Sequence, residues 1–387
     1  MKLEYGERQR LQTEIIGTSK ARNLTLCMVQ SLVAGHFHIH LKLEKLMRQR
    51  IILVCWLILF TLLTAGQSLA WAEETQSPQM SAVVAEIGRI GKAAKGTVGV
   101  AAIHLETGRK IAHNANEFFP MASTVKVAVA AKILDLVDKG QISLTSLIPV
   151  KRSELAPGGP LGDIHWRPGL SFSAADLLEP MITKSDNTST DVLYRVAGGP
   201  AAVHAYLQAL GLKEIYPARY IRELLRDVLS IPAPASSTIS LTDQFRRMSP
   251  KQASTRRAKA YRANPAYDAD PRDQATPAAM LGLLCKIWLE DGVSRSARSM
   301  LLPIMERSTT GLKRIRGRLP VGTIVEDKTG TLAGTVNDVG FITLPDGKGH
   351  IAIVVFVKGS EAPSDTRETV IADIARLVYD YFLISAQ

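Results

Sequence analysis

The sequence predicts a mixed α/β (α+β) fold with two lobes. Runs rich in β-branched residues, broken by turn residues, occur on both sides of a long central segment, at 97–113 and 323–358. In the central segment most apolar residues recur at helical spacing. With 46% hydrophobic and 21% charged residues, the composition is that of a globular protein. We therefore expect an antiparallel sheet flanked by helices, formed by both chain ends, and an all-helical lobe between them.

The amino-terminal part of the expected sheet lobe starts with a helix. Ile87 and Ile90 belong to an apolar stripe at helical spacing over 81–91. Strands at 97–105 and 109–113 follow, joined by a Glu-Thr-Gly turn. These elements predict a helix packed on a hairpin.

The central segment predicts a series of helices. The run 125–137 is almost wholly apolar and should be a buried helix. Ser173, with Asp176 three residues later, should cap another helix. Further helices are expected at 188–196, 199–210, 275–289 and 295–306.

The carboxy-terminal part should complete the sheet. Strands are expected at 323–329, 335–344 and 350–358, and a closing helix at 364–383. The domain boundaries that follow are 81–118 with 313–387 for the sheet lobe and 119–312 for the helical lobe. A cleft between two such lobes is a common position for a ligand site.

The first 72 residues are not expected to belong to the fold. Residues 47–72 have the parts of a secretory signal: a basic start, an uncharged apolar run at 51–65 and a small-x-small site at Ala70-Trp71-Ala72. Residues 1–46 would then be an upstream extension, and the mature chain, 73–387, would be exported to the periplasm or secreted without stable membrane insertion. The alternative is an uncleaved anchor, for which the apolar run is short.

The net charge of +11 is concentrated in one internal segment besides the leader. Residues 228–267 are rich in Pro, Ser and Ala, which predicts a flexible surface insertion. Its acidic residue is Asp243, and its basic residues are Arg246, Arg247, Lys251, Arg256, Arg257, Lys259 and Arg262. Few aromatic residues lie among them, so a solvated loop is favoured over a nucleic-acid surface, and no nucleic-acid partner is expected.

The first chemical motif is Ser123-Thr124-Val125-Lys126, at the start of the apolar helix. Backbone N–H groups at a helix start favour negative charge, and a residue three positions later lies on the same face. A Lys held in a dry site can be neutral and accept the Ser123 proton. The alternative is a capping Ser with a solvated Lys, but Lys126 lies within an apolar run, where a charged residue needs a reason.

The second motif is Ser185-Asp186-Asn187, immediately before a predicted helix. Such residues also favour a helix cap or a turn. In a catalytic interpretation Ser185 passes a proton, and Asn187 orients Lys126 and a substrate amide.

The third motif is Lys328-Thr329-Gly330-Thr331, at the end of a predicted strand. Gly330 permits close approach of a ligand to the backbone. Lys328 and Thr329 can bind a carboxylate, and the Thr331 N–H can pair with that of Ser123 in an oxyanion hole. The alternative is a strand that ends in a turn.

In this order the three motifs resemble those of the class A serine β-lactamases and the related penicillin-binding proteins. The resemblance covers about 81–387 without the insertion. It implies a β-lactamase-like fold and a β-lactam-hydrolysing enzyme of antibiotic resistance that forms an acyl-enzyme on Ser123. It further implies that Arg367 binds the substrate carboxylate and that Trp166 is the aromatic residue at the cleft mouth, although a packing role suits Trp166 equally.

The sequence departs from this family where a Glu should activate the deacylating water. The matching position is Ile221, and a shift of two residues brings in Glu223, which could also be a solvated helix residue. The alternatives are therefore a D-Ala-D-Ala peptidase or a penicillin-binding module that deacylates slowly. We expect a small-molecule β-lactam substrate, a monomer, no cofactor and no metal, since the histidines lack metal-ligand spacing.

Overall fold

The computed structural model describes residues 78–385 except 235 and 237. They form one compact unit, Gln76–Gln387. The expected upstream extension 1–46 and signal peptide 47–72 lie outside the described residues. Within the described part of the chain, no helix has both the length and the apolar character needed to cross a membrane.

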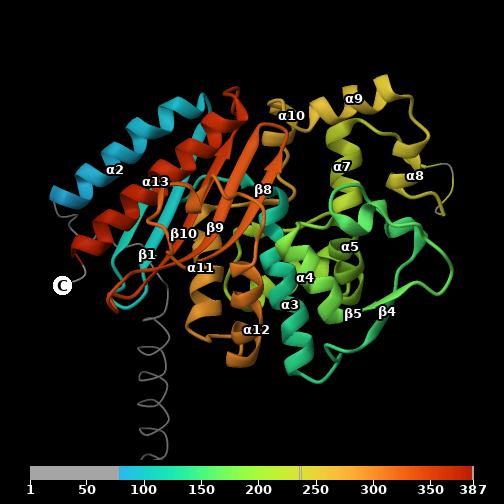
Figure 1. Cartoon of the computed structure of the whole chain (residues 1–387), viewed down its shortest axis with the longest axis horizontal. Coiled ribbons are helices and arrows are strands. Elements are labelled where there is room, and N and C mark those ends of the chain that lie inside the picture. Colours follow the sequence, from blue (N-terminus) through green and yellow to red (C-terminus); the bar gives the residue numbers. More distant parts are fainter. Residues whose placement is uncertain (1–77, 235, 237, 386–387) are drawn as a thin grey trace, which may run out of the picture. The chain divides into compact units, whose positions relative to one another are not determined.

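Both ends of this unit contribute to one antiparallel sheet, as the sequence predicts (Figure 1). Its five strands have the order β2-β1-β10-β9-β8. Strand β1 pairs with β10 from Thr97 opposite Lys358 to His104 opposite Ile351, which joins the two ends of the unit. The strands are β1 (Thr97–His104), β2 (Lys110–His113), β8 (Val325–Leu332), β9 (Thr335–Thr343) and β10 (His350–Lys358).

Two helices cover one face of the sheet. Helices α2 (Pro78–Gly91) and α13 (Ser364–Ser385) lie side by side there (Figure 1). Alternate strand residues such as Val100 and Ile353 point to this face and are fully buried with Ile87 and Phe382. The stripe predicted at 81–91 thus packs on the sheet.

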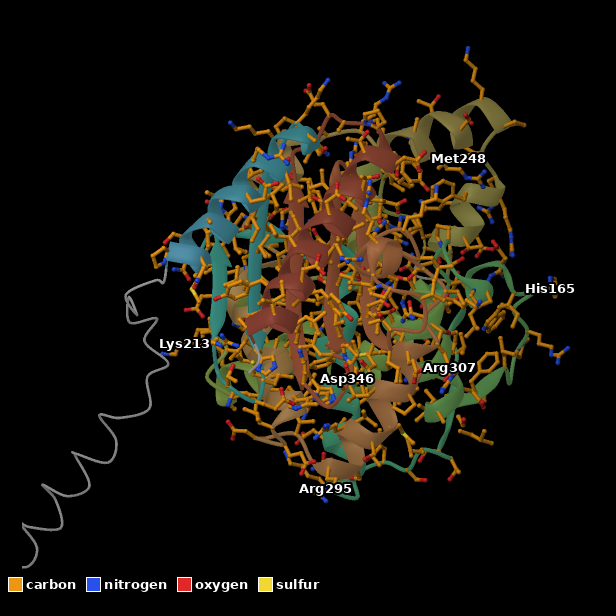
Figure 2. The ribbon with its side chains drawn as sticks, turned by 60° about the vertical axis from the view of Figure 1, so that its left-hand side comes forward. His165, Lys213, Met248, Arg295, Arg307 and Asp346 are labelled. Carbon is orange, nitrogen blue, oxygen red and sulfur yellow. The ribbon has the colours of Figure 1, made fainter. Side chains whose placement is uncertain are left out.

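The opposite face packs on the helical lobe. Helix α11 (Pro277–Trp288) contacts β1 and β10. In β10 the residues between those of the first face, Val354 and Phe356 among them, are buried in this second core. The other helices of the lobe are α3 (Lys126–Asp138), α4 (Ala174–Thr183), α5 (Asn187–Val196), α6 (Pro200–Ala209) and α12 (Arg295–Glu306). Arg295 and Arg307, labelled in Figure 2, mark the two ends of α12.

Short elements connect the two layers. Strand β7 (Gln274–Ala275) lies between β3 (Phe119–Pro120) and β6 (Ile215–Tyr216), and β4 (Leu147–Pro149) pairs with β5 (Ser171–Ser173). The 3₁₀ turns are η1 (Lys92–Ala94), η2 (Ala122–Val125), η3 (Arg152–Glu154), η4 (Pro160–Asp163) and η5 (Ile315–Arg318). The predicted cap of α4 is present: the Ser173 hydroxyl accepts the Asp176 N–H at 3.0 Å.

The basic segment 228–267 differs from its prediction, because much of it is helical. After α7 (Ile221–Leu229) come α8 (Leu241–Arg246), α9 (Pro250–Lys259) and α10 (Pro265–Asp268). The Ser and Pro residues that suggested a flexible loop are helix-start signals. The side chains of Ser240 and Ser249 accept the N–H groups of Asp243 and Gln252, and Pro250 lies in the first turn of α9.

A small apolar cluster holds this segment in place. Leu241 and Tyr267 of the segment are buried with Leu224 of α7 and Leu332 of β8. Figure 1 shows α7, α8 and α9 together at one end of the unit, and Met248, between α8 and α9, marks the region in Figure 2. The segment is therefore an additional wall of the fold, although α9 itself buries no residue.

Candidate active site

Ser123 lies where the sheet meets the helical lobe. It belongs to the 3₁₀ turn η2, which leads directly into α3. The residue before it, Ala122, has a left-handed φ of 47°, so the chain turns sharply as it presents the serine. Ser123 is half-buried and lines a cavity of about 720 Å³.

Lys126 is fully buried in the first turn of α3, below this cavity. Its Nζ donates hydrogen bonds to the Ser185 carbonyl oxygen at 2.7 Å, to Ser185 Oγ at 3.1 Å and to Asn187 Oδ1 at 2.8 Å. Burial, and then the charge of Lys328, lower the pKa of Lys126 well below its usual value, while Asp186 and Asp191 act in the opposite direction. The three donated bonds use the three protons of the ammonium form. A lysine with a lowered pKa can also exist as the neutral amine near neutral pH, in which Nζ keeps two N–H donors and its lone pair can accept a proton.

Ser185 joins the two lysines of the motifs. Its Oγ accepts hydrogen bonds from Lys126 Nζ and from Lys328 Nζ, each at 3.1 Å. A hydroxyl has two lone pairs and one proton. With both lone pairs in use, the Ser185 proton is free to be donated into the cavity, which Ser185 lines.

Close backbone packing positions the Ser185-Asp186-Asn187 loop. The Asn187 side chain donates to the Pro157 carbonyl at 2.8 Å, and a Cβ on Gly158 would lie 2.7 Å from Asn187 Nδ2. A Cβ on Gly159 would lie 2.4 Å from the Asp186 Cα. Asp186 in turn caps α5 by accepting the Ser189 N–H at 2.6 Å. The loop is thus fixed by contacts that larger residues would break.

Strand β8 brings the third motif against the serine turn. A Cβ on Gly330 would lie 2.7 Å from the Met121 carbonyl oxygen and 3.1 Å from Ser123 N. Only glycine therefore lets this strand pass so close to Ser123 without a shift of backbone. The next residue, Thr331, lines the cavity, as does Thr329.

Burial disfavours the positive charge of Lys328, and two neighbouring carboxyl groups partly offset this effect. Burial, together with Arg314, lowers the pKa of Lys328 to about 7, while the carboxyl groups of Asp327 and Asp338 oppose this shift. Both carboxyl groups are themselves buried, and burial raises the pKa of each. The Asp338 side chain accepts the Ile315 N–H at 3.1 Å. Lys328 therefore lies near the two buried carboxyl groups of Asp327 and Asp338.

Arg314 is a cavity residue that the sequence interpretation missed. Its guanidinium donates to Thr331 Oγ1 at 2.6 Å, to the Gly330 carbonyl at 3.1 Å and to the Asn337 carbonyl at 2.9 Å. It also pairs with Glu368 at 3.1 Å. The arginine precedes the strand in a region without a recognised motif, so nothing in the sequence alone placed it next to Thr331.

Two residues suggested by the resemblance lie elsewhere. Arg367 is buried and donates to the Ala362 carbonyl at 2.7 Å and to the Tyr261 carbonyl at 3.2 Å, and it does not line the cavity. Trp166 donates through its ring nitrogen to the Val150 carbonyl at 2.8 Å and packs against the core of the helical lobe. The structure therefore places Arg314, rather than Arg367, beside the third motif.

Glu223 does not line the cavity either. It lies in the first turn of α7, where its carboxylate accepts the Tyr220 N–H at 3.2 Å, and its side chain is 45% exposed. The α7 side chains that do line the cavity are Leu225 and Leu229. Ile221, the position that matches the family's Glu, is buried. This part of the wall is apolar where the family pattern has a carboxylate.

The segment 228–267 supplies a further wall of the cavity. Its lining residues are Thr242, Phe245, Arg246, Arg257, Ala260 and Tyr261. The composition of this segment predicts a solvated loop, whereas its Ser and Pro residues start helices that line the cavity. The cavity thus has a catalytic side, from η2, α5 and β8, and an insertion side, from α7, α8 and α9.

The arrangement suits nucleophilic chemistry at Ser123. A hydroxyl, a lysine with a lowered pKa and a second hydroxyl held by two lysines meet at one cavity. Across the described residues, no group of three or more His, Cys, Asp or Glu side chains could hold a metal ion.

Comparisons with known proteins agree with this geometry. The model of the beta-lactamase enzyme family matches residues 82–382. The extended-spectrum beta-lactamase PER-1 of Pseudomonas aeruginosa is 29% identical over 80% of this chain and 89% of its own length. Beta-lactamase VEB-1 of the same organism is 28% identical over 87% of this chain and 98% of its own.

Solved structures give the same result. An ancestral class A beta-lactamase is 32% identical and superposes with a TM-score of 0.63 over 77% of this chain and 99% of its own. A beta-lactamase from Chitinophaga pinensis is 31% identical, with a TM-score of 0.61 over 78% of this chain and 99% of its own.

Proposed function

The chain belongs to the class A serine β-lactamase family, and we propose that it opens β-lactam rings by forming an acyl-enzyme on Ser123. The observation that carries this proposal is the meeting of Lys126 and Lys328 on Ser185 Oγ, at the cavity that Ser123 lines. In this hydrogen-bonded group Lys126 can act as the base for Ser123, and Ser185 can act as the acid that protonates the leaving nitrogen.

Acylation begins when the neutral Lys126 amine accepts the Ser123 proton. Ser123 Oγ then bonds to the β-lactam carbonyl carbon, and the N–H groups of Ser123 and Thr331 stabilise the negative oxygen. As the ring C–N bond breaks, Ser185 gives its proton to the nitrogen. Ser185 recovers a proton from the Lys126 ammonium, to which it is hydrogen-bonded at 3.1 Å. The product is an acyl-Ser123 ester with an opened ring.

The carboxylate next to the ring nitrogen is bound by the β8 side. Lys328, whose pKa is lowered to about 7, carries positive charge below that pH, and the adjacent Thr329 lines the cavity. Arg314 donates to Thr331 Oγ1 at 2.6 Å and is paired with Glu368, so it adds a guanidinium donor to this side while its charge is balanced by Glu368. An Arg with a carboxylate forms a strong charge-assisted hydrogen bond, so Arg314 takes the role that the sequence suggested for Arg367.

Deacylation is the slow step of the proposed reaction. Hydrolysis requires a base that activates water at the ester, and α7 presents Leu225 and Leu229 to the cavity while Glu223 caps its own helix. We expect turnover with a rapid acylation phase and a slower release. The second candidate function is a penicillin-binding module that stays acylated, which is the case in which the deacylation rate falls to almost zero.

Nitrocefin kinetics with intact-protein mass spectrometry test this proposal. We expect an initial burst equal to the enzyme concentration, then slower steady hydrolysis, with a ring-opened adduct on Ser123. Ser123→Ala should lose both signals while its thermal melt is unchanged. Absence of any adduct on the native protein would overturn the acyl-enzyme; an adduct without steady hydrolysis would favour the second candidate.

We also propose that the protein acts as an exported monomer. The signal predicted at 47–72 supports export, and a cleaved amino terminus at Glu73 in the expressed protein would test it. Size-exclusion chromatography with light scattering tests the monomer.

A further inference from the structure

Resting on the proposed function, we propose that the insertion forms a subsite for an anionic group on the acyl side chain of a β-lactam. The subsite is formed by Arg257 and Arg246, with Tyr261 and Phe245 beside them, all lining the same cavity as Ser123. It would make β-lactams with a second negative charge the preferred substrates.

The insertion is held close to the nucleophile. Ala122, the residue before Ser123, belongs to the same apolar cluster as Leu241 and Tyr267 of the insertion. The Ala333 N–H, at the end of β8, donates to the Ala260 carbonyl at 2.6 Å. A Cβ on Gly334 would lie 2.6 Å from the Ala263 Cα, so the chain after α9 lies directly on the turn after β8. The insertion side of the cavity is therefore a fixed neighbour of the catalytic side.

Helix α9 is oriented so that Arg257 faces the cavity. Arg256 donates to the Leu229 carbonyl at 2.8 Å, and Lys259 to Ser230 Oγ at 3.1 Å, which ties one face of α9 to the end of α7. Ala260 and Tyr261, in the turn that directly follows α9, line the cavity together with Arg257. Within the described residues, no hydrogen bond or ion pair joins the Arg257 side chain to another residue.

The charges of the cavity favour an anion at this end. Arg246 donates to the backbone carbonyls of Asp163 and Ile164, at 3.1 and 3.4 Å, which orients its guanidinium without neutralising it. The acidic side chains that line the cavity are those of Asp163 and Glu368, and Glu368 is paired with Arg314 on the β8 side. Arg246 and Arg257 therefore outnumber the one carboxylate, Asp163, on the insertion side.

The substrate geometry directs the side chain to this wall. In a β-lactam the ring carboxylate and the acyl side chain lie on opposite sides of the scissile carbonyl. When Lys328 and Arg314 hold the carboxylate, the side chain extends toward α7, α8 and α9. Leu225 and Phe245 contact its apolar part, and Arg257 reaches a terminal or α-carbon anion, as planar guanidinium groups bind carboxylates.

The test compares two penicillins that differ by one carboxylate, benzylpenicillin and carbenicillin. Stopped-flow mass spectrometry of acyl-Ser123 gives the second-order acylation constant for each. We expect carbenicillin to be preferred, and this preference to fall about five- to tenfold in Arg257→Gln and further in Arg246→Gln/Arg257→Gln. The preference of the native protein should also fall as salt is raised.

Arg247→Gln is the matched control, because it removes one exposed charge next to Arg246 from a side chain that does not line the cavity. It should leave the preference unchanged. The subsite would be overturned if the native protein and the double variant prefer carbenicillin over benzylpenicillin to the same degree. If benzylpenicillin still acylates Ser123 in that case, the proposed function remains intact. If neither penicillin acylates Ser123, the proposed function itself fails.

Discussion

The two sides of the cavity are built in different ways. On the catalytic side, Lys126 and Lys328 are fully buried, and Ser185 and Asn187 are held by hydrogen bonds to both backbone and side chains. On the insertion side, α9 buries no residue, and Arg257 is exposed. The proposed acylation would thus use a buried, hydrogen-bonded arrangement, whereas the insertion side presents an exposed cation to the cavity.

Ion pairs join the two ends of the loop that contains the insertion. Arg219, at one end of the loop, is buried and pairs with Asp273 at 2.6 Å, at the other end. It also pairs with Asp227 at 2.7 Å and with Asp270 at 3.1 Å. Loop-closure entropy grows slowly with length, so a closed base lets many residues be added between its ends. From this difference we expect acylation and substrate preference to be separable properties of the cavity.

Lys126→Ala should have the largest effect and tests the catalytic side. It removes the base and the donor to Ser185, so we expect the acylation constant to fall about 10³-fold. Lys139→Ala, which removes an exposed charge near the end of the same helix, is the control. Both are measured by rapid-quench mass spectrometry with thermal melts. Acylation of Lys126→Ala within tenfold of the native rate would show that another group is the base.

Gly330→Ala should have the next largest effect, because its Cβ would lie 2.7 Å from the Met121 carbonyl oxygen. Strand β8 must then move away from the serine turn and misalign the oxyanion donors, which predicts an acylation loss of about 10²-fold. Gly88→Ala in α2, where a Cβ would meet only the His113 ring at 3.3 Å, should change acylation little. Equal acylation by both variants would contradict the close approach of β8.

The pH dependence of acylation should separate the two lysines. Below the lowered pKa of Lys126 its amine is protonated, so the maximal acylation rate should fall toward acid pH. Lys328, with a pKa of about 7, loses its charge as pH rises, so carboxylate binding should weaken above about pH 7. Stopped-flow acylation over a range of substrate concentrations measures rate and affinity separately. An affinity that stays constant up to about pH 9 would show that Lys328 remains charged or does not bind the carboxylate.

The catalytic side could be predicted from the sequence because its residues are local motifs with a fixed order. Ser123 and Lys126 share a helix turn, and Ser185 and Lys328 each adjoin a strong structural signal. The sheet was predictable for the same reason: alternating apolar strands and turn residues carry a local pattern. The structure adds that Lys126 and Lys328 both donate hydrogen bonds to Ser185 Oγ. The spacing of the motifs in the sequence does not reveal this arrangement.

The insertion side could not be predicted because its decisive contacts are between residues distant in sequence. Tyr267 of the insertion is buried with Leu332 of β8, a contact that only folding creates. On the β8 side the contact of Arg314 with Thr331 has the same origin. The helix starts at Ser240 and Ser249 were present in the sequence, but Pro and Ser suggest loops and caps equally. The resemblance implied that Arg367 binds the substrate carboxylate. In the structure its side chain donates instead to the Tyr261 carbonyl.

Substitution of Glu223 should have the smallest effect and decides whether the insertion side takes part in chemistry. Gln can accept the Tyr220 N–H as Glu does, but it cannot act as a base. Glu223→Gln should therefore leave both stability and deacylation almost unchanged. Glu223→Ala should lose the cap and about 0.5–1 kcal/mol of unfolding free energy, with deacylation still unchanged. Thermal melts and the decay of acyl-Ser123 measure the two properties. A tenfold longer acyl-enzyme lifetime in Glu223→Gln, whose cap is intact, would restore Glu223 as the base, because this variant removes only the charge.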